Sequence, residues 1–70
     1  MRLEIYDTGH YEYLEVDNFA AAKVTMMSIG ARAHENLLKQ GKVVKLEMKE
    51  SEYAIIGDHH HVWFSARIIN

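Results

Sequence analysis

Hydrophobic and polar residues alternate between residues 2 and 16 and again after residue 43, a pattern typical of β-strands with one buried face. In the first of these stretches, Leu3 and Ile5 alternate with polar neighbours. The segment Asp7-Thr8-Gly9-His10 then has the composition of a tight turn, and residues 11–16 are rich in β-forming side chains. The pattern predicts a β-hairpin over residues 2–16.

An apolar pattern with helical period begins after Asp17 and Asn18, either of which can cap a helix N-terminus. Glu35 and Lys39 form a favourable pair four residues apart, and Gly41 stands where a helix commonly ends. Two adjacent apolar stripes follow the helix, one with Phe19, Ala22, Met26, Ile29, Ala33 and Leu37, the other with Ala20, Val24, Met27, Ala31 and Leu38. We therefore expect a helix over residues 19–40 with an apolar face well over 100° wide.

Three further strands are predicted over residues 44–49, 53–56 and 61–69, with turns between them. In the last strand, the period of two places Val62, Phe64, Ala66 and Ile68 on one side and His61, Trp63, Ser65 and Arg67 on the other. The order ββαβββ predicts an α+β fold, a five-stranded antiparallel sheet with one long helix packed across one face. The expected inner surface of the sheet consists of Leu3, Ile5, Leu14, Val16, Val44, Leu46, Met48, Val62, Phe64 and Ile68.

A chain of 70 residues forms one domain, residues 1–70, because it is too short to divide its buried surface between two cores. The absence of cysteine excludes disulfides and thiolate zinc sites. No apolar run approaches the roughly 20 residues that a membrane span needs. Because Glu4 stands where a signal peptide would be apolar, we expect a cytoplasmic protein that does not contact a membrane.

Helix length and strand length together predict self-association. A helix of about 22 residues is about 33 Å long, whereas strands of six to eight residues span roughly 20 to 26 Å. Either the helix bends near Gly30 or one end extends beyond the sheet, and an apolar end that extends beyond the sheet needs cover from a second molecule. Met27, Gly30, Ala31, His34 and Leu38 offer a patch where a second helix can approach, so we expect a homodimer or higher oligomer. The alternative for Gly30 is that it lets the helix lie close to its own sheet.

The other expected surface is the face of the sheet that the helix leaves open. Tyr6, Tyr11, Tyr13, Trp63 and Arg67 are predicted there, and Tyr, Trp and Arg dominate protein-binding hot spots. The leading interpretation is a non-enzymatic protein-interaction module that docks a sheet face or edge on a protein partner. Its small size, lack of cysteine and acidic N-terminal hairpin resemble those of phage-encoded inhibitors of host proteins. The alternative for these residues is a solvated sheet face without a partner.

Two other functions use different residues. Basic side chains beside sheet aromatics also hold nucleic acids; here they are Lys39, Lys42, Lys45, Lys49 and Arg67. The second of these functions is metal binding at a zinc or nickel site, because His59 and His61 fall on one side of an extended segment, with Asp58 or His10 as a third ligand.

We expect no catalytic residues and no cofactor, since the chain has neither a glycine-rich phosphate loop nor a serine nucleophile motif.

Overall fold

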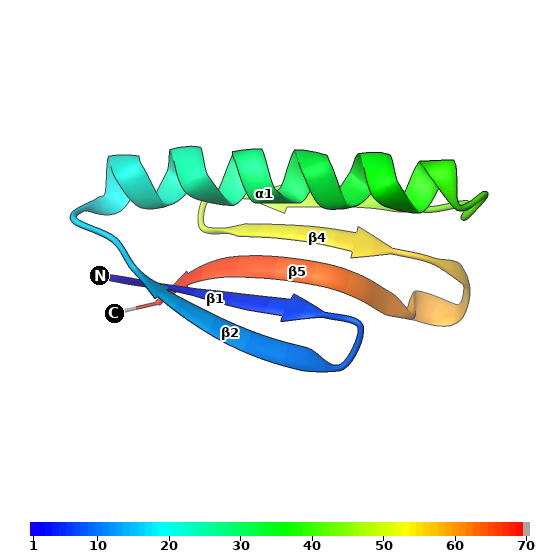
Figure 1. Cartoon of the computed structure of the whole chain (residues 1–70), viewed down its shortest axis with the longest axis horizontal. Coiled ribbons are helices and arrows are strands. Elements are labelled where there is room, and N and C mark those ends of the chain that lie inside the picture. Colours follow the sequence, from blue (N-terminus) through cyan, green and yellow to red (C-terminus); the bar gives the residue numbers. More distant parts are fainter. Residues whose placement is uncertain (70) are drawn as a thin grey trace.

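The computed structural model describes residues 1–69, and it confirms the predicted α+β fold with the element order ββαβββ. Five strands form one sheet, and a single helix lies across one of its faces (Figure 1). The strands are β1 (Arg2–Asp7), β2 (His10–Glu15), β3 (Lys45–Lys49), β4 (Glu52–Ile56) and β5 (Val62–Ile69); the helix is α1 (Phe19–Lys39), and a short 3-10 turn, η1 (Asp58–His60), precedes β5.

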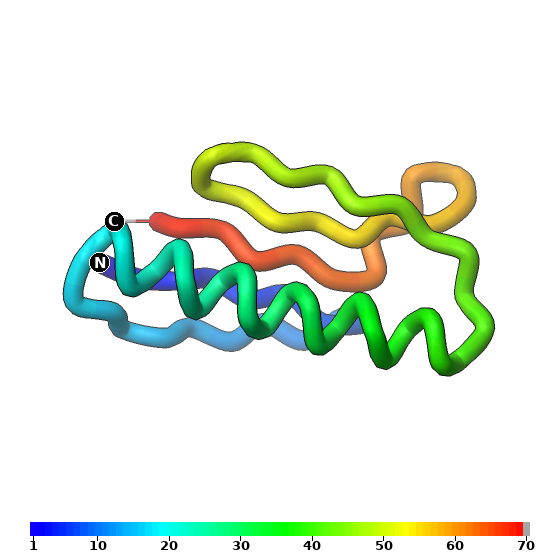
Figure 2. The backbone as a smooth tube through the Cα atoms, turned by 90° about the horizontal axis from the view of Figure 1, so that it is seen from above, coloured from blue at the N-terminus to red at the C-terminus, as the bar shows by residue number. Residues whose placement is uncertain are grey.

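The strands are ordered β2-β1-β5-β4-β3, and every neighbouring pair is antiparallel. The first and last strands of the chain are therefore neighbours at the centre of the sheet, with Arg2 opposite Ile69. The two outermost strands are β2 and β3. The backbone trace shows β3 along one long side of the molecule, with α1 crossing the sheet at an angle to it (Figure 2).

A two-residue turn closes the β1–β2 hairpin within residues 7–10, where the sequence predicted a turn, and positive φ at both of its central residues is the mark of type I′. Its two central residues, Thr8 and Gly9, have φ angles of 44° and 91°. Glycine accepts such an angle without strain, whereas threonine does not, so Gly9 is the residue on which the turn depends. The turn aligns Asp7 with His10 and fixes the register of the hairpin.

Both ends of α1 are capped by residues close to those predicted. The Asn18 side-chain oxygen accepts a hydrogen bond of 2.8 Å from the backbone N–H of Ala21. At the other end the helix stops at Lys39, one residue earlier than predicted. The N–H of Gly41 donates to the Leu38 carbonyl at 3.0 Å and the N–H of Lys42 to the Leu37 carbonyl at 3.1 Å, which together form a Schellman motif. Over residues 1–69, no helix has the length and apolar content of a membrane span.

The core lies between α1 and the central strands β1, β5 and β4. Its largest fully buried side chains are Phe64, Leu3, Met26 and Ile55. Among the described residues no polar or charged residue is buried. The helix contributes Ala22, Met26, Gly30 and Leu37 as its buried positions, which belong to the first predicted stripe except for Gly30. The second stripe therefore remains on the surface.

One part of the predicted inner surface is wrong. The register between β4 and β5 shifts at Ile55 and Ile56, so that Ile56 lies opposite Val62 while Ile55 lies opposite Phe64. This bulge exchanges the sides of Val62 and Trp63. Trp63 packs against the core beside Leu37 at the end of α1, and Val62 lies on the opposite face near Tyr6.

Candidate protein-binding face

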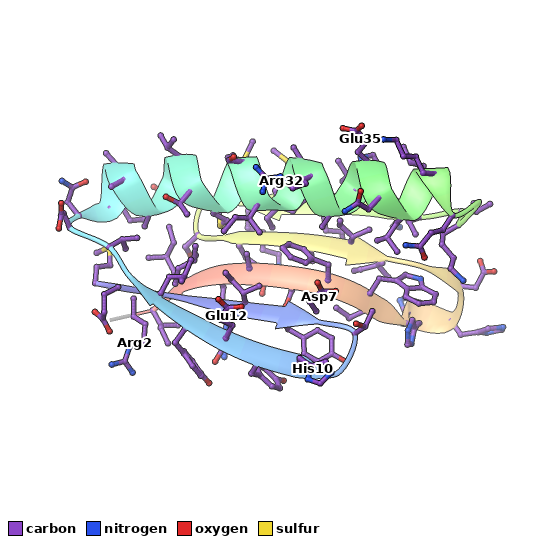
Figure 3. All side chains as sticks on the ribbon, in the orientation of Figure 1. Arg2, Asp7, His10, Glu12, Arg32 and Glu35 are labelled. Atoms are coloured by element: carbon purple, nitrogen blue, oxygen red, sulfur yellow. The ribbon has the colours of Figure 1, made fainter. Side chains whose placement is uncertain are left out.

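The sheet surface opposite α1, here called the outer face, is built by the residues that alternate with the buried ones. Leu3 and Ile5 are buried beneath the helix, so their neighbours on β1 must point the other way. Figure 3 shows Arg2 on this side of the sheet. The strand registers add their partners: the outer face consists of Arg2, Glu4, Tyr6, Tyr11, Tyr13, Glu15, Lys45, Glu47, Lys49, Glu52, Ala54, Ile56, Val62, Ser65, Arg67 and Ile69.

A row of polar side chains crosses the middle of this face. Glu4 is its centre: its carboxylate accepts a hydrogen bond from the Tyr13 hydroxyl at 3.1 Å and forms an ion pair of 2.8 Å with the Arg67 guanidinium. Glu52 lies opposite Arg67 on the next strand, and the Lys49 ammonium group is 4.0 Å from the Glu52 carboxylate. The row therefore runs across all five strands, from the neutral Tyr13 on β2 through alternating charges on the other four strands.

Glu4 is the best-shielded charge in this row. Only 15% of its side chain is exposed, compared with 55% for Arg67. The hydrogen bond to the Glu4 carboxylate and the nearby negative charge raise the pKa of Tyr13 above its usual range. Contacts on both sides of Glu4 thus favour one orientation of the Tyr13 ring and of the Arg67 guanidinium, and both side chains remain accessible to a partner.

Tyrosines form the apolar part of the outer face. The rings of Tyr6 and Tyr11 lie 5.1 Å apart and are tilted by 58°. Tyr11 and Tyr13 are 63% and 51% exposed, which is high for aromatic side chains on a sheet. The Arg2 guanidinium lies over the Tyr13 ring at 5.8 Å and also pairs with Glu15 at 2.8 Å. The β1–β2 hairpin therefore carries a tyrosine cluster whose rings already contact their neighbours.

A shallow hollow of about 340 Å³ lies between the tyrosine cluster and the polar row. Ser65 and Val62 line it from β5, Tyr6 and Tyr11 border it on one side, and Arg67 borders it on the other together with the carboxylates of Glu4 and Glu52. Aromatic walls, a hydroxyl and a guanidinium around one depression suit the insertion of a side chain from another protein.

Acidic and basic groups on the outer face balance each other. The basic residues are Arg2, Lys45, Lys49 and Arg67, and the acidic residues are Glu4, Glu15, Glu47 and Glu52. Both arginines are paired with carboxylates. A nucleic acid needs a surface with excess positive charge, because phosphate neutralisation supplies most of its affinity.

The other lysines of the nucleic-acid hypothesis do not join this face. Lys39 pairs with Glu35 at 3.1 Å on the helix, and the Lys42 ammonium group lies over the Trp63 ring at 4.7 Å. These basic groups are thus divided between the helix, the loop after it and the sheet. The geometry does not bring them together into one track for a phosphate backbone.

The histidine turn is exposed and tightly wound. His59 and His60 have φ angles of 58° and 59°, so the segment is not the extended one on which the metal hypothesis was based. The His61 ring instead packs edge-on against Trp63, with ring centres 4.5 Å apart. Within residues 1–69, no three His, Asp or Glu side chains are arranged to hold a metal ion.

The five residues predicted for self-association separate into two groups. Gly30 is buried against Tyr53: a Cβ atom added there would lie 2.6 Å from the tyrosine ring. Gly30 therefore packs on its own sheet, the alternative noted above, and its assignment to an interface is wrong. Met27 and Leu38 are 39% and 52% exposed, Ala31 is exposed and His34 is half-buried.

The sequence placed three tyrosines, Arg2 and Arg67 on the outer face correctly, but Glu4 and Glu52 were missed. Their signal was present, since both alternate with apolar residues on their strands. What the sequence did not contain was the neighbour relation between β1 and β5, which brings Glu4 against Arg67 across 63 positions of chain. No protein-family model, curated protein or solved structure gives a significant match to this chain.

Proposed function

We propose that this protein is a non-enzymatic interaction module that docks the outer face of its sheet onto another protein. The observation that carries the proposal is the tyrosine cluster on the β1–β2 hairpin, with Tyr11 and Tyr13 exposed. Water-exposed aromatic rings beside an ordered guanidinium are the residue types on which protein interfaces depend most.

Prior ordering of these side chains favours binding. A side chain that is immobilised only on binding costs about 0.5–1.5 kcal/mol of conformational entropy. Tyr13 and Arg67 are already held by Glu4, and Tyr11 packs against Tyr6. Less of that cost remains to be met when a partner arrives, so a small face can still bind with useful affinity.

The balanced charge of the face favours a protein over a nucleic acid. A protein surface can complement alternating charges at short range, whereas a phosphate backbone meets repulsion at each carboxylate. A module of this kind acts by covering a surface of its partner, as an inhibitor or an adaptor does.

Site-specific photocrosslinking in the native cell tests the proposal. A photoreactive phenylalanine analogue is placed at Tyr11, on the outer face, and in a second protein at Arg32, which lies on the exposed side of α1 (Figure 3). We expect one protein to crosslink at position 11 and to be absent from crosslinks at position 32. The double substitution Tyr11→Ser and Tyr13→Ser should then abolish capture of that protein.

The matched control for the double substitution is Val24→Ser with Met27→Ser, which also removes two exposed apolar side chains, but from the helix. Equal crosslinking at both positions, or crosslinks to nucleic acid alone, would overturn the proposal. Binding to oligonucleotides that falls steeply between 50 and 200 mM salt, about 1000-fold or more, would favour the nucleic-acid alternative.

A further inference from the structure

Strand β3 is an edge strand that lacks cover on its helix side. Its residues Leu46 and Met48 lie opposite the buried Ile55 and Tyr53, so their side chains face the same side of the sheet as α1. The helix packs against β5, β4 and β1. As a result Leu46 and Met48 remain 39% and 54% exposed.

The neighbouring side of the helix is also apolar and exposed. Val24 and Met27 are 71% and 39% exposed, and they line a groove together with Met48. The backbone trace seen from above shows the helix diverging from the edge formed by β3 (Figure 2). An apolar groove beside an unpaired strand edge has both of the features by which a second β-strand binds, free backbone groups and uncovered apolar side chains.

The sequence of β3 is complementary to itself in one antiparallel register. When Leu46 lies opposite Leu46 of a second copy, Val44 lies opposite Met48 and Lys45 lies opposite Glu47, each twice by symmetry. Apolar residues then meet apolar residues on the helix side, and opposite charges meet on the outer face. Cross-strand pairs of both kinds stabilise a sheet, whereas like charges directly opposite destabilise it.

The neighbouring registers lack this complementarity. Centring the pair on Glu47 places the two Glu47 carboxylates opposite each other and each Lys45 opposite a Lys49. Centring it on Met48 places Leu46 opposite Glu50. Charge therefore selects the register centred on Leu46.

We infer that two copies of this protein associate through β3, antiparallel and with Leu46 on the two-fold axis, to form one continuous ten-stranded sheet. Both helices then lie on the same side of that sheet, because the axis is perpendicular to it. Leu46 and Met48 of the two copies form one apolar floor between the helices. Such an interface is closed by symmetry and stops at two copies.

The other edge strand does not offer an equivalent pairing. Glu12 of β2 lies opposite the buried Ile5, so its carboxylate is on the helix side. Because every neighbouring pair in the sheet is antiparallel, the two edge strands run in the same direction, and a β2–β3 contact that keeps the helices on one side is parallel. It brings Glu12 beside the apolar helix-side residues of β3, such as Leu46 and Met48. That contact sets a carboxylate against an apolar side chain and would also propagate into open filaments.

Cysteine crosslinking tests the register directly, because the chain has no cysteine of its own. Under mild oxidation, we expect Leu46→Cys to form a disulfide-linked dimer at least about tenfold faster than Met48→Cys, since residues on the axis are within disulfide range. In the proposed register the two positions 48 are about 13 Å apart along the strands, too far for a disulfide. Equal rates, or faster crosslinking at position 48, would overturn the register.

A charge exchange tests the pairing without altering its apolar residues. Glu47→Lys places lysine opposite Lys45 twice and should raise the dissociation constant of the dimer about tenfold or more, measured by sedimentation. Adding Lys45→Glu restores opposite charges and should restore the dimer. Glu12→Lys is the control, with the same change of charge on the other edge strand.

Three results would refute the inference. The first is a wild-type protein that stays monomeric even at about 100 μM. The others are a double variant whose dimer dissociates as readily as that of Glu47→Lys, and a Glu12→Lys variant that weakens the dimer as much as Glu47→Lys does. Circular dichroism of each variant separates loss of pairing from loss of fold. The inference does not depend on the proposed docking function, because the tyrosine cluster lies on β1 and β2.

Discussion

Substituting Gly30 with alanine measures how closely α1 approaches the sheet. A Cβ atom at this position would lie 2.6 Å from both Cδ1 and Cε1 of Tyr53, and 2.8 Å from Cζ. Carbon atoms that are not bonded prefer a separation of about 3.5–4.0 Å. The helix or the tyrosine ring must therefore move by about 1 Å to accept the methyl group.

The surrounding core gives little room for that movement. Tyr53 is 3% exposed and packs edge-on against Phe64, with ring centres 6.5 Å apart. Overpacking a close-packed core costs about 1–3 kcal/mol, and a clash with a buried ring belongs in the upper part of that range. Alanine regains about 1 kcal/mol over glycine in a helix. We therefore expect Gly30→Ala to lower the free energy of unfolding by about 1–2 kcal/mol.

Urea unfolding monitored by circular dichroism at one fixed protein concentration provides the measurement. The decisive comparison repeats Gly30→Ala in a Tyr53→Leu background, where the ring is absent. There the alanine should stabilise the protein by up to about 1 kcal/mol through helix propensity alone. If Gly30→Ala stabilises the protein while Tyr53 is present, the close approach of helix and sheet is wrong.

Three other substitutions test separate parts of the fold. Asn18→Ala should cost about 1 kcal/mol in urea unfolding because it removes the helix cap, whereas Asp17→Ala should cost clearly less. Gly57→Ala should shift the fluorescence of Trp63, the single tryptophan, to longer wavelength, because the added Cβ atom would lie 2.5 Å from the indole nitrogen and push the ring toward water. An unchanged emission spectrum would contradict the close contact between Gly57 and Trp63. Burial raises the pKa of Tyr53, so the contribution of its neutral hydroxyl to stability is complete below pH 10 and is lost as the pH rises above 10. The variant Tyr53→Phe has no group that ionises there and should therefore lose less stability than the wild type between pH 9 and 11. Parallel pH profiles of the two proteins would contradict the raised pKa.

Local sequence signals were sufficient for most of the secondary structure. Three of these signals act within four residues of chain: the positive-φ turn at Thr8 and Gly9, the cap at Asn18 and the Schellman glycine at Gly41. Their effects can therefore be inferred from the residue types in each short segment. Alternation also assigned Tyr11 and Tyr13 to the correct face. These features predicted the element order without any contact between distant residues, and the structure confirms it.

Long-range contacts explain the errors. Both Val62 and Trp63 are apolar, so alternation continues equally well with either of them inside, and only the bulge opposite Ile56 decides between them. The role of Gly30 depended in the same way on Tyr53, a residue 23 positions later in the chain. A helical pattern shows that a position is small, but it does not show which neighbour approaches it.

The two proposed surfaces together make a further quantitative prediction. Pairing through β3 places β2 at both ends of a ten-stranded sheet, so nine strand spacings, about 43 Å, separate the two tyrosine clusters. A dimer therefore presents two docking faces to one side and binds an immobilised partner at two points, which slows dissociation without any new contact. Glu47 lies on β3, at the opposite edge of the outer face from the tyrosine cluster, so Glu47→Lys should lower single-site affinity much less than the tyrosine double substitution does. It should dissociate at least about tenfold faster than the wild type from a densely coated surface, and most of that difference should vanish on a sparse one. The tyrosine double substitution should lose binding on both surfaces, so equal dissociation of Glu47→Lys and wild type at high density would separate a failure of the dimer from a failure of the docking face.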